Sequence, residues 1–539
     1  MPEESTLPLV ELFIGAGSQE RLNSNLPASG KSQHYPAYLK WEGELHRVNA
    51  RYVGDNHWHW LYEQKSWRIK TVKSQLINGA REFNLKNPRT RIAFNEAISM
   101  ELAASVGLIA PRVFPVRLVL NGEFHGVYLW QDVIDETVLK RSGRSIGSLY
   151  DGDGASRNVK TGVSALWEDE VWWRKDIWQD SKSQFDRTEI RELIAQVNED
   201  SLLSFYEFAT RKLHQDHYTT FVSLDNILAG GHHDFNHNHK LYFDPGTGRM
   251  EPVAWDTDAW QFRNVWLDCA HNPLLVNWKL IPQLDHQRLK KLHSLIVDGP
   301  LTEENVIRRI SEYDLRVRES LEADFRKDYK YWNALEFLKF KVYPMLVYGI
   351  EAYVEQVDYY REGVRKRFRF LRDYLDDCSV RYQVSRSSGE TLLTVASAGK
   401  VAAELDRIRI KGTFDEIHVY RDKNLNGRLD DSDELLTLAR SELGIATVSL
   451  SDLIYPGYKK EGVSPHRSQF LFGPYDYLSS PLPFTYILSV AQGAIEKVEL
   501  DCNNVLTGVP VEVQETVLTE DLFEATVSLH PWALPGRTN

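Results

Sequence analysis

Residues 230–258, GGHHDFNHNHKLYFDPGTGRMEPVAWDTD, form the stretch on which the fold assignment depends. It begins with a polar loop, and KLYF, DPGTG and MEPVAWD then predict a strand, a turn and a second strand. An apolar run with helical character, FVSLDNILA, precedes the loop. The expected order is therefore a helix, a polar loop and a hairpin that ends in aspartates.

The polar residues of this stretch fit phosphoryl transfer. That chemistry needs a carboxylate to orient an attacking hydroxyl and hard oxygen ligands to hold Mg²⁺ on nucleotide phosphates. Protein kinases place the base and an Asn ligand on one loop, and a metal-binding Asp after the hairpin that follows. Asp234, Asn238 and Asp256 occur in that order and context.

Two other interpretations of the loop remain open. Its four histidines could hold zinc, for which imidazole is a frequent ligand, although no HExxH pair is present and the neighbouring turn offers no thiolate. The histidines could also serve only as caps and hydrogen-bonding groups of a polar loop.

The composition is that of a globular protein with several domains. The chain has 539 residues, a net charge of −12 and 42% hydrophobic residues. The acidic balance disfavours a protein whose main task is neutralising nucleic-acid phosphates, and no apolar run approaches the length of a membrane-spanning helix. Three distant cysteines predict neither a disulfide framework nor a metal clip.

Three regions differ in their patterns. Residues 8–139 mix aromatic and β-branched strands with one helix, which predicts an N-terminal lobe that binds nucleotide. Residues 140–376 are mostly helical and carry the loop and hairpin. Residues 380–539 show short alternating strands and predict a separate β-sandwich.

Six ordered motifs give the chain a family resemblance: ARYVGDNHW (50–58), KSWRIK (65–70), ELAASVGLIAPR (101–112), LVLNGEFHGVYLWQDVID (118–135), GSLYDGD (147–153) and HNHKLYFDPGTGRMEPVAWDTD (237–258). The sequence resembles the CotH spore-coat kinases, atypical members of the protein-kinase-like fold, over roughly residues 10–370. The resemblance implies an α+β fold in which a two-lobed kinase-like domain precedes the β-sandwich. It also implies transfer of the γ-phosphate of ATP to a hydroxyl, with protein Ser/Thr as the expected acceptor and Mg²⁺ or Mn²⁺ as the metal.

Carried over by position, the resemblance makes Asp234 the catalytic base. Asn238 and Asp256 become metal ligands. Asp258 becomes either a second metal contact or a residue that orders the loop.

The same resemblance assigns Lys70 to the nucleotide phosphates. Arg68 is its rival, because alternate residues of a strand point to one face. Glu101, on the following helix, is the expected partner that positions Lys70. Glu96, about 140° away around that helix, is the alternative.

Two further positions are candidates for contact with the nucleotide. Gly54 ends a strand where backbone can approach phosphates closely. Asp132 stands where the family usually has Glu, and is expected either to contact the nucleoside or to be a rim carboxylate.

Departures from the family pattern alter the expected acceptor side. Ala254 replaces the usual Pro, and His239 and Lys240 replace two aromatic residues. Alternatives therefore stay open: an ATP-dependent ligase or nucleotidyl transferase on the same fold, or a surface scaffold or adhesin without catalysis.

A second motif, DKNLNGRLDDSDE at residues 422–434, resembles an EF-hand-like or dockerin-like calcium loop. Gly427 occupies its turn position, and the expected ligand positions are Asp422, Asn424, Asn426, Arg428, Asp430 and Asp433. Asp at the last position predicts weak binding, which suits an environment rich in calcium outside the cell. The start of the chain, MPEESTLPLVELF, lacks a leader, so we expect either an exported protein whose leader has been removed or a cytoplasmic one.

Overall fold

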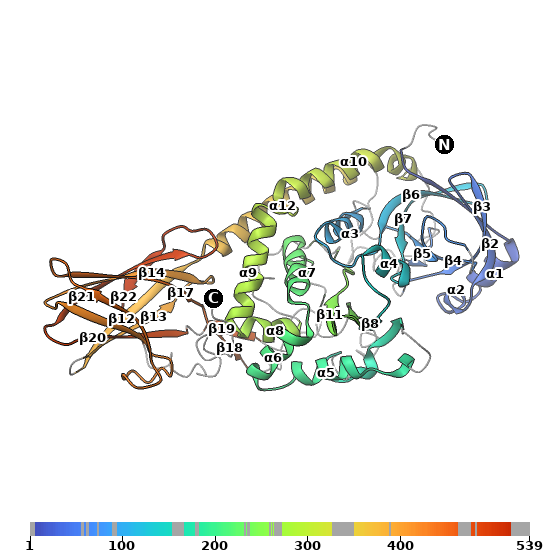
Figure 1. Ribbon diagram of the computed structural model, residues 1–539. Helices are drawn as coiled ribbons and strands as arrows, with labels where there is room; N and C mark the ends of the chain where they lie inside the picture. The colour runs from blue at the N-terminus through green and yellow to red at the C-terminus, as the bar shows by residue number, and fades with distance from the viewer. Residues whose placement is uncertain are drawn as a thin grey trace.

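The computed structural model contains a β-barrel, a helical region and a C-terminal β-domain (Figure 1). It describes residues 6–54, 59–60, 64–72, 75–88, 94–152, 166–177, 183–230, 233, 238–257, 260, 262, 272–325, 350–387, 390–461, 476–479 and 482–518. No helix in these ranges is long and apolar enough to cross a membrane.

The N-terminal region is a closed barrel with the strand order β1-β2-β3-β4-β5-β7-β6. Its elements are β1 (Leu9–Ile14), α1 (Ala16–Asn23), α2 (Ala28–Ser32), β2 (Tyr35–Trp41), β3 (Glu44–Tyr52), β4 (Trp67–Thr71), β5 (Glu82–Lys86), α3 (Asn95–Ser105), β6 (Val113–Leu120) and β7 (Glu123–Asp132). Parallel pairing of β1 with β6 closes the barrel, and the other neighbours are antiparallel.

Alternation along the strands separates the inside of the barrel from its outside. Trp67 and Ile69 of β4, and Phe83 and Leu85 of β5, are buried in the barrel core. Their sequence neighbours therefore point outward. The polar side chains of β3, β4, β5 and β7 thus gather on one outer face, and α3 packs beside it.

The helical region follows the barrel. Its elements are α4 (Glu136–Arg141), β8 (Ser148–Gly152), η3 (Glu170–Trp172), β9 (Arg174–Ile177), η4 (Ser183–Phe185), α5 (Thr188–Val197), α6 (Leu202–Lys212), α7 (Gln215–Leu228), β10 (His239–Asp244), β11 (Arg249–Pro252), α8 (Pro273–Leu280), α9 (Pro282–Val297), α10 (Glu303–Phe325) and α12 (Ile350–Asp376). The four strands form one sheet in the order β11-β10-β8-β9.

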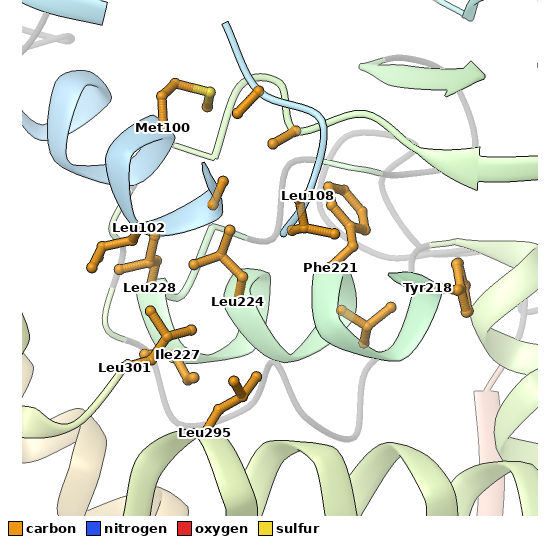
Figure 2. Packing of buried hydrophobic residues seen from close by; sticks show 14 of the residues in the cluster. Met100, Leu102, Leu108, Tyr218, Phe221, Leu224, Ile227, Leu228, Leu295 and Leu301 are labelled. Carbon is orange, nitrogen blue, oxygen red and sulfur yellow. The ribbon is translucent and has the colours of Figure 1, made fainter. Parts of the chain in front are cut away.

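One continuous core joins α3 to this region. Leu102 of α3 packs beside Leu228 of α7, whose other side faces Leu295 of α9 (Figure 2). Burial of these aliphatic side chains on both sides makes α7 the central helix. The loop that follows α7 therefore starts from a rigid support.

The β-domain contains two sheets around one core, with the orders β16-β15-β20-β13-β12-β22 and β17-β14-β21, and a small β18–β19 hairpin. Its strands are β12 (Ser379–Ser387), β13 (Glu390–Ser397), β14 (Ala403–Gly412), β15 (Glu416–Arg421), β16 (Glu434–Arg440), β17 (Ile445–Ile454), β18 (Tyr458–Glu461), β19 (Asp476–Ser479), β20 (Pro483–Val490), β21 (Ile495–Asn504) and β22 (Glu512–Glu515).

The β-domain packs against the helical region. Lys279 of α8 lies over the ring of Tyr458, with 4.3 Å between the ammonium and the ring centroid. Asn504 of β21 donates a hydrogen bond to the Leu375 carbonyl in the last turn of α12 (2.8 Å). Contacts from β17–β18 and from β21 thus reach two separate helices.

Candidate active site

The β10–β11 hairpin brings two of the expected metal ligands to the same end. Asn238 precedes β10 directly, and Asp256 follows β11. The Val253 amide donates to the Lys240 carbonyl (2.9 Å), so the pairing continues toward both residues. Asn238 and Asp256 each have a positive φ, +69° and +48°, a left-handed conformation that Asn and Asp adopt more readily than other non-glycine residues.

His233 joins the polar loop to the segment that contains Asp256. Its Nε2 lies 2.6 Å from the Trp255 carbonyl, and its Nδ1 lies 3.3 Å from an Asp225 carboxylate oxygen. Burial lowers the pKa of His233, but Asp225, the Trp255 carbonyl and Asp256 outweigh it, and the net pKa is raised. The residue before Asp234 therefore contacts the residue before Asp256. Asp234 and Asp258 themselves lie outside the described residues.

A buried ion pair joins β5 to the first turn of α3, the helix that contacts this end of the hairpin. The ammonium of Lys86, at the end of β5, is 2.7 Å from both carboxylate oxygens of Glu96, in the first turn of α3. The two side chains are 10% and 7% exposed. Gln131 of β7 donates a third hydrogen bond to Glu96 (2.6 Å) and accepts one from Asn84 (2.9 Å). Charges this buried persist only when paired, so this network fixes α3 on the barrel.

The first two turns of α3 connect the ion pair to the hairpin end. Ser99 lies three residues after Glu96, so the two residues are neighbours on the surface of the helix, about one turn apart. Its hydroxyl donates to the Thr257 carbonyl (3.3 Å) and accepts from the Trp260 indole (2.8 Å). Lys86 and Glu96 are thus separated from the residue after Asp256 by one helical turn.

Lys70 and Arg68 point to the outer face of β4, as the sequence predicts. Arg68 lies 3.0 Å from a carboxylate oxygen of Glu82 and donates to Asn84 (2.6 Å), whereas Lys70 is 52% exposed and 3.6 Å from Glu82. Burial, and then the charge of Arg68, lowers the pKa of the neighbouring Arg51. Arg68 and Lys70 therefore share the Glu82 carboxylate, and Arg51 lies opposite Arg68 on the adjacent strand. We name Arg51, Arg68 and Lys70 the cationic roof.

The expected pairing of Glu101 with Lys70 is not the one in the structure. Glu101 contacts Arg309 of α10 (2.7 Å), and Lys70 contacts Glu82. The rival residue Glu96 holds a lysine, but that lysine is Lys86. Glu101 lies five residues after Glu96, about 140° around the helix, and therefore faces away from the barrel strands.

Lys86 was missed because its strand is short. The segment EFNLK alternates polar and apolar residues directly before the helix, and this signal could have identified the lysine. Its pairing with β7, Lys86 opposite Leu129, is long-range and does not follow from local pattern.

Gly54 and Asp132 lie in environments that the sequence did not predict. Gly54 has a φ of +104°, and a Cβ there would lie 2.2 Å from His59 Cγ, so the close approach is to a side chain of the protein. Asp132 is fully buried and accepts hydrogen bonds from Arg112 (2.9 Å), Arg141 (2.7 Å) and Trp130 (2.9 Å). Its carboxylate fixes the segment that leaves the barrel.

Comparison with known proteins identifies the family of this chain. The model of the CotH kinase protein family matches residues 51–371, more than half of the chain. The chain belongs to the CotH kinase protein family. Inner spore coat protein H of Bacillus subtilis (strain 168) is 20% identical over 395 residues, which cover 70% of this chain and 99% of that protein. The crystal structure of the Helicobacter pylori proinflammatory kinase CtkA matches at 10% identity and a TM-score of 0.22, covering 57% of this chain and 94% of CtkA.

The β15–β16 loop of this CotH-family chain lies beyond the matched range and contains the expected calcium ligands. Asp422 is fully buried and accepts from the Asn426 and Gly427 amides (3.1 and 2.8 Å), and Gly427 has a φ of +70°. Asp430 accepts from the side-chain amides of Asn424 and Asn426 (2.9 and 2.7 Å). Burial, and to a lesser extent Asp433, raises the pKa of Asp422.

The donor set of this loop is of mixed type. In the described part of the chain no group of three or more His, Cys, Asp or Glu side chains is arranged to hold a metal. The loop instead combines carboxylates with amide oxygens, and its Asn amides are turned with their N–H groups toward Asp430. Rotating those amides by half a turn presents oxygens in the same place, which suits a hard cation.

Proposed function

We propose that this chain is an ATP-dependent phosphotransferase in which the barrel and the helical region act as the two lobes of a kinase. The observation that carries the proposal is the hydrogen bond from Ser99, one turn after Glu96 of the buried Lys86–Glu96 pair, to the carbonyl of Thr257, the residue after Asp256. A metal-bound triphosphate requires oxygen ligands for the metal, here Asn238 and Asp256, and a fixed lysine for the phosphates, here Lys86. Membership of the CotH kinase family supports the same chemistry.

The residue types fit a divalent metal and a nucleotide. The Asn238 amide and the Asp256 carboxylate supply hard oxygen donors for Mg²⁺ or Mn²⁺, and Asp258 is the further candidate. A bound metal would neutralise charge that develops on the transferred phosphoryl group. Lys86 would hold the phosphates, oriented by Glu96, in the role first assigned to Lys70. The cationic roof, which includes Lys70 and Arg68, adds positive charge beside it.

In the proposed reaction Asp234 orients an acceptor hydroxyl, with protein Ser/Thr as the expected acceptor. The hydroxyl oxygen forms a bond to the γ-phosphorus, and the bond from the γ-phosphorus to the bridging oxygen breaks. The hydroxyl proton passes to Asp234, and ADP leaves with the bridging oxygen.

The decisive experiment is transfer from γ-labelled ATP, with Mg²⁺ or Mn²⁺, to a panel of protein and small-molecule hydroxyls. We expect transfer by the wild type and loss of nearly all transfer in Asp234→Asn, Asp256→Asn and Lys86→Met. Asp244→Asn changes a carboxylate at the opposite end of the β10–β11 hairpin and should retain activity. Transfer by Asp256→Asn at the wild-type rate would refute the metal assignment.

The same experiment separates the alternative functions. The mass of the product distinguishes an added phosphate from an added AMP or glutamate, the outcomes expected of a nucleotidyl transferase or a ligase. A wild-type protein that binds no nucleotide would be a scaffold or adhesin.

We also propose that the loop of residues 422–433 binds a structural Ca²⁺. The support is its ligand order together with two carboxylates, Asp422 and Asp433, whose mutual repulsion a cation would relieve. Weak calcium binding favours a location outside the cytoplasm. The spore-coat relative is consistent with an exported or coat-associated protein.

A further inference from the structure

Helix α10 passes along the outside of α3 and ends at the barrel (Figure 1). It starts in the helical region, next to α9, and its last turn contacts strand β7. The helix therefore touches both proposed lobes. The proposed transfer reaction assigns no role to it.

Two residues of α10 contact α3 near its beginning and its end. Arg309 forms an ion pair with Glu101 (2.7 Å). One turn later, the ring of Tyr313 stacks on Phe94, with 5.6 Å between centroids and 28° between the planes. Burial, followed by Glu101, raises the pKa of Tyr313. Phe94 directly precedes α3, so these contacts fix the turn from which Glu96 extends to Lys86.

The last turn of α10 fixes the segment that leads into β4. Asp324 is buried, and its carboxylate accepts from the side-chain amide of Gln64 (3.0 and 3.1 Å) and from the Val127 amide (3.1 Å). A Cβ at Gly126 would lie 2.1 Å from Asp324 Oδ1, so a glycine is required for this approach.

Gln64 transmits this contact to the neighbourhood of Lys86. Its backbone carbonyl accepts from the side chain of Asn87 (2.8 Å), and Asn87 is the residue after Lys86. The Asn87 amide donates to the hydroxyl of Ser66, which lies just before β4 (2.9 Å). Asp324 therefore supports, through Gln64, the start of β4 and the end of β5, where the proposed phosphate-binding Lys86 lies.

We propose that α10 is a positioning strut for the nucleotide site. Arg309 holds α3, and with it Glu96, in place, and Asp324 holds the segment from Gln64 to β4 over the same lysine. Neither residue is placed at the reacting atoms, so both are positioning residues. This inference rests on the proposed function for its effect on nucleotide binding.

A charge exchange tests the contact with α3. Arg309→Glu and Glu101→Arg each place like charges together, and the double variant E101R/R309E restores an ion pair of opposite polarity. Calorimetric titration with Mg·ADP is expected to show about fivefold weaker binding in each single variant, the upper range for one partly exposed pair. The double variant should recover most of the affinity.

Asp324→Asn tests the second contact. It keeps the shape of the side chain, but it replaces one of the two accepting carboxylate oxygens with an NH₂ group, which cannot accept from Gln64 or Val127. We expect about tenfold weaker Mg·ADP binding, the effect of losing roughly one hydrogen bond to a charged group. Glu319→Gln changes an exposed carboxylate on the same helix and serves as the matched control.

Hydrogen exchange gives a readout that does not depend on nucleotide. Amides of α3 should exchange faster in Arg309→Glu, and those of residues 64–71 faster in Asp324→Asn, with both segments unchanged in Glu319→Gln. Normal exchange and normal Mg·ADP affinity in the single variants would overturn the strut. Failure of the wild type to bind Mg·ADP would instead overturn the proposed function, and exchange would still decide the strut.

Discussion

Removing the charge of Lys86 should destabilise the protein far more than removing that of Lys70. In Lys86→Met the carboxylate of Glu96, whose side chain is 7% exposed, loses both contacts of 2.7 Å and keeps only the Gln131 hydrogen bond. Breaking a buried pair by removing one partner costs about 3–5 kcal/mol, and the retained hydrogen bond favours the lower end, about 3 kcal/mol.

Lys70→Met provides a matched control on the adjacent strand. Lys70 is 52% exposed and lies 3.6 Å from Glu82, and such pairs contribute about 0–1 kcal/mol. The substitution is the same in both variants, so the difference between them reports burial of the ion pair. That difference should be about 2–3 kcal/mol in the free energy of unfolding.

Urea unfolding without nucleotide measures both variants, together with Glu96→Gln and the double variant K86M/E96Q. Glu96→Gln alone leaves a buried ammonium and should also destabilise, by about 2–3 kcal/mol. The double variant removes both charges and should return to within about 1 kcal/mol of the wild type. Equal losses in Lys86→Met and Lys70→Met, or losses that simply add in the double variant, would refute the reasoning.

Four further outcomes are expected. Gly54→Ala should lose about 2 kcal/mol or more in unfolding free energy, because strain at positive φ is joined by the clash with His59, whereas Gly43→Ala, with open space around it, shows the strain alone. Asp132→Asn should cost about 2 kcal/mol, less than the loss of a fully buried pair, because Asp132 is buried but Arg112 and Arg141 are 33% and 32% exposed. Chelating calcium should lower the melting temperature of the wild type but not of Asp422→Asn. The free energy of unfolding that calcium adds to the wild type is about 1.4 kcal/mol when free calcium is ten times Kd. Burial and then Lys290 lower the pKa of His286 to about 4, so its contribution to stability is present above pH 6.5 and is lost as pH falls toward 4. In His286→Gln the melting temperature should therefore change less with pH over this range.

Local pattern predicted the elements that carry a strong periodicity. The hairpin from His239 to Pro252 lies where the sequence places it around the DPGTG turn, and strands such as Tyr35–Trp41 and Trp67–Thr71 lie in the region of residues 8–139 that is predicted to be rich in strands. The long charged helices α10 and α12 lie within residues 140–376, which the sequence predicts to be mostly helical. These elements depend on contacts between near neighbours, which a single sequence contains.

The closed barrel and the position of Lys86 depend on distant contacts. Closure needs β1 to lie parallel to β6, with Leu9 opposite Arg117, and no local signal specifies that partner. The choice between Glu96 and Glu101 depends on which side of α3 faces the barrel. That side is the one on which Glu96 meets Lys86 and Gln131, while Glu101 meets Arg309, about two hundred residues further along the chain. The helical wheel alone therefore left the choice open.

Helix α12 turns the β-domain into a rigid extension of the proposed catalytic region. The helix has 27 residues and is about 40 Å long at 1.5 Å per residue. Asn504 of the β-domain binds its last turn, and Tyr458 of the β-domain packs against Lys279 of α8. Two attachments at separate points suppress rotation that a single tether would permit. A displacement of the β-domain relative to the β10–β11 hairpin would therefore have to break at least one of these two contacts.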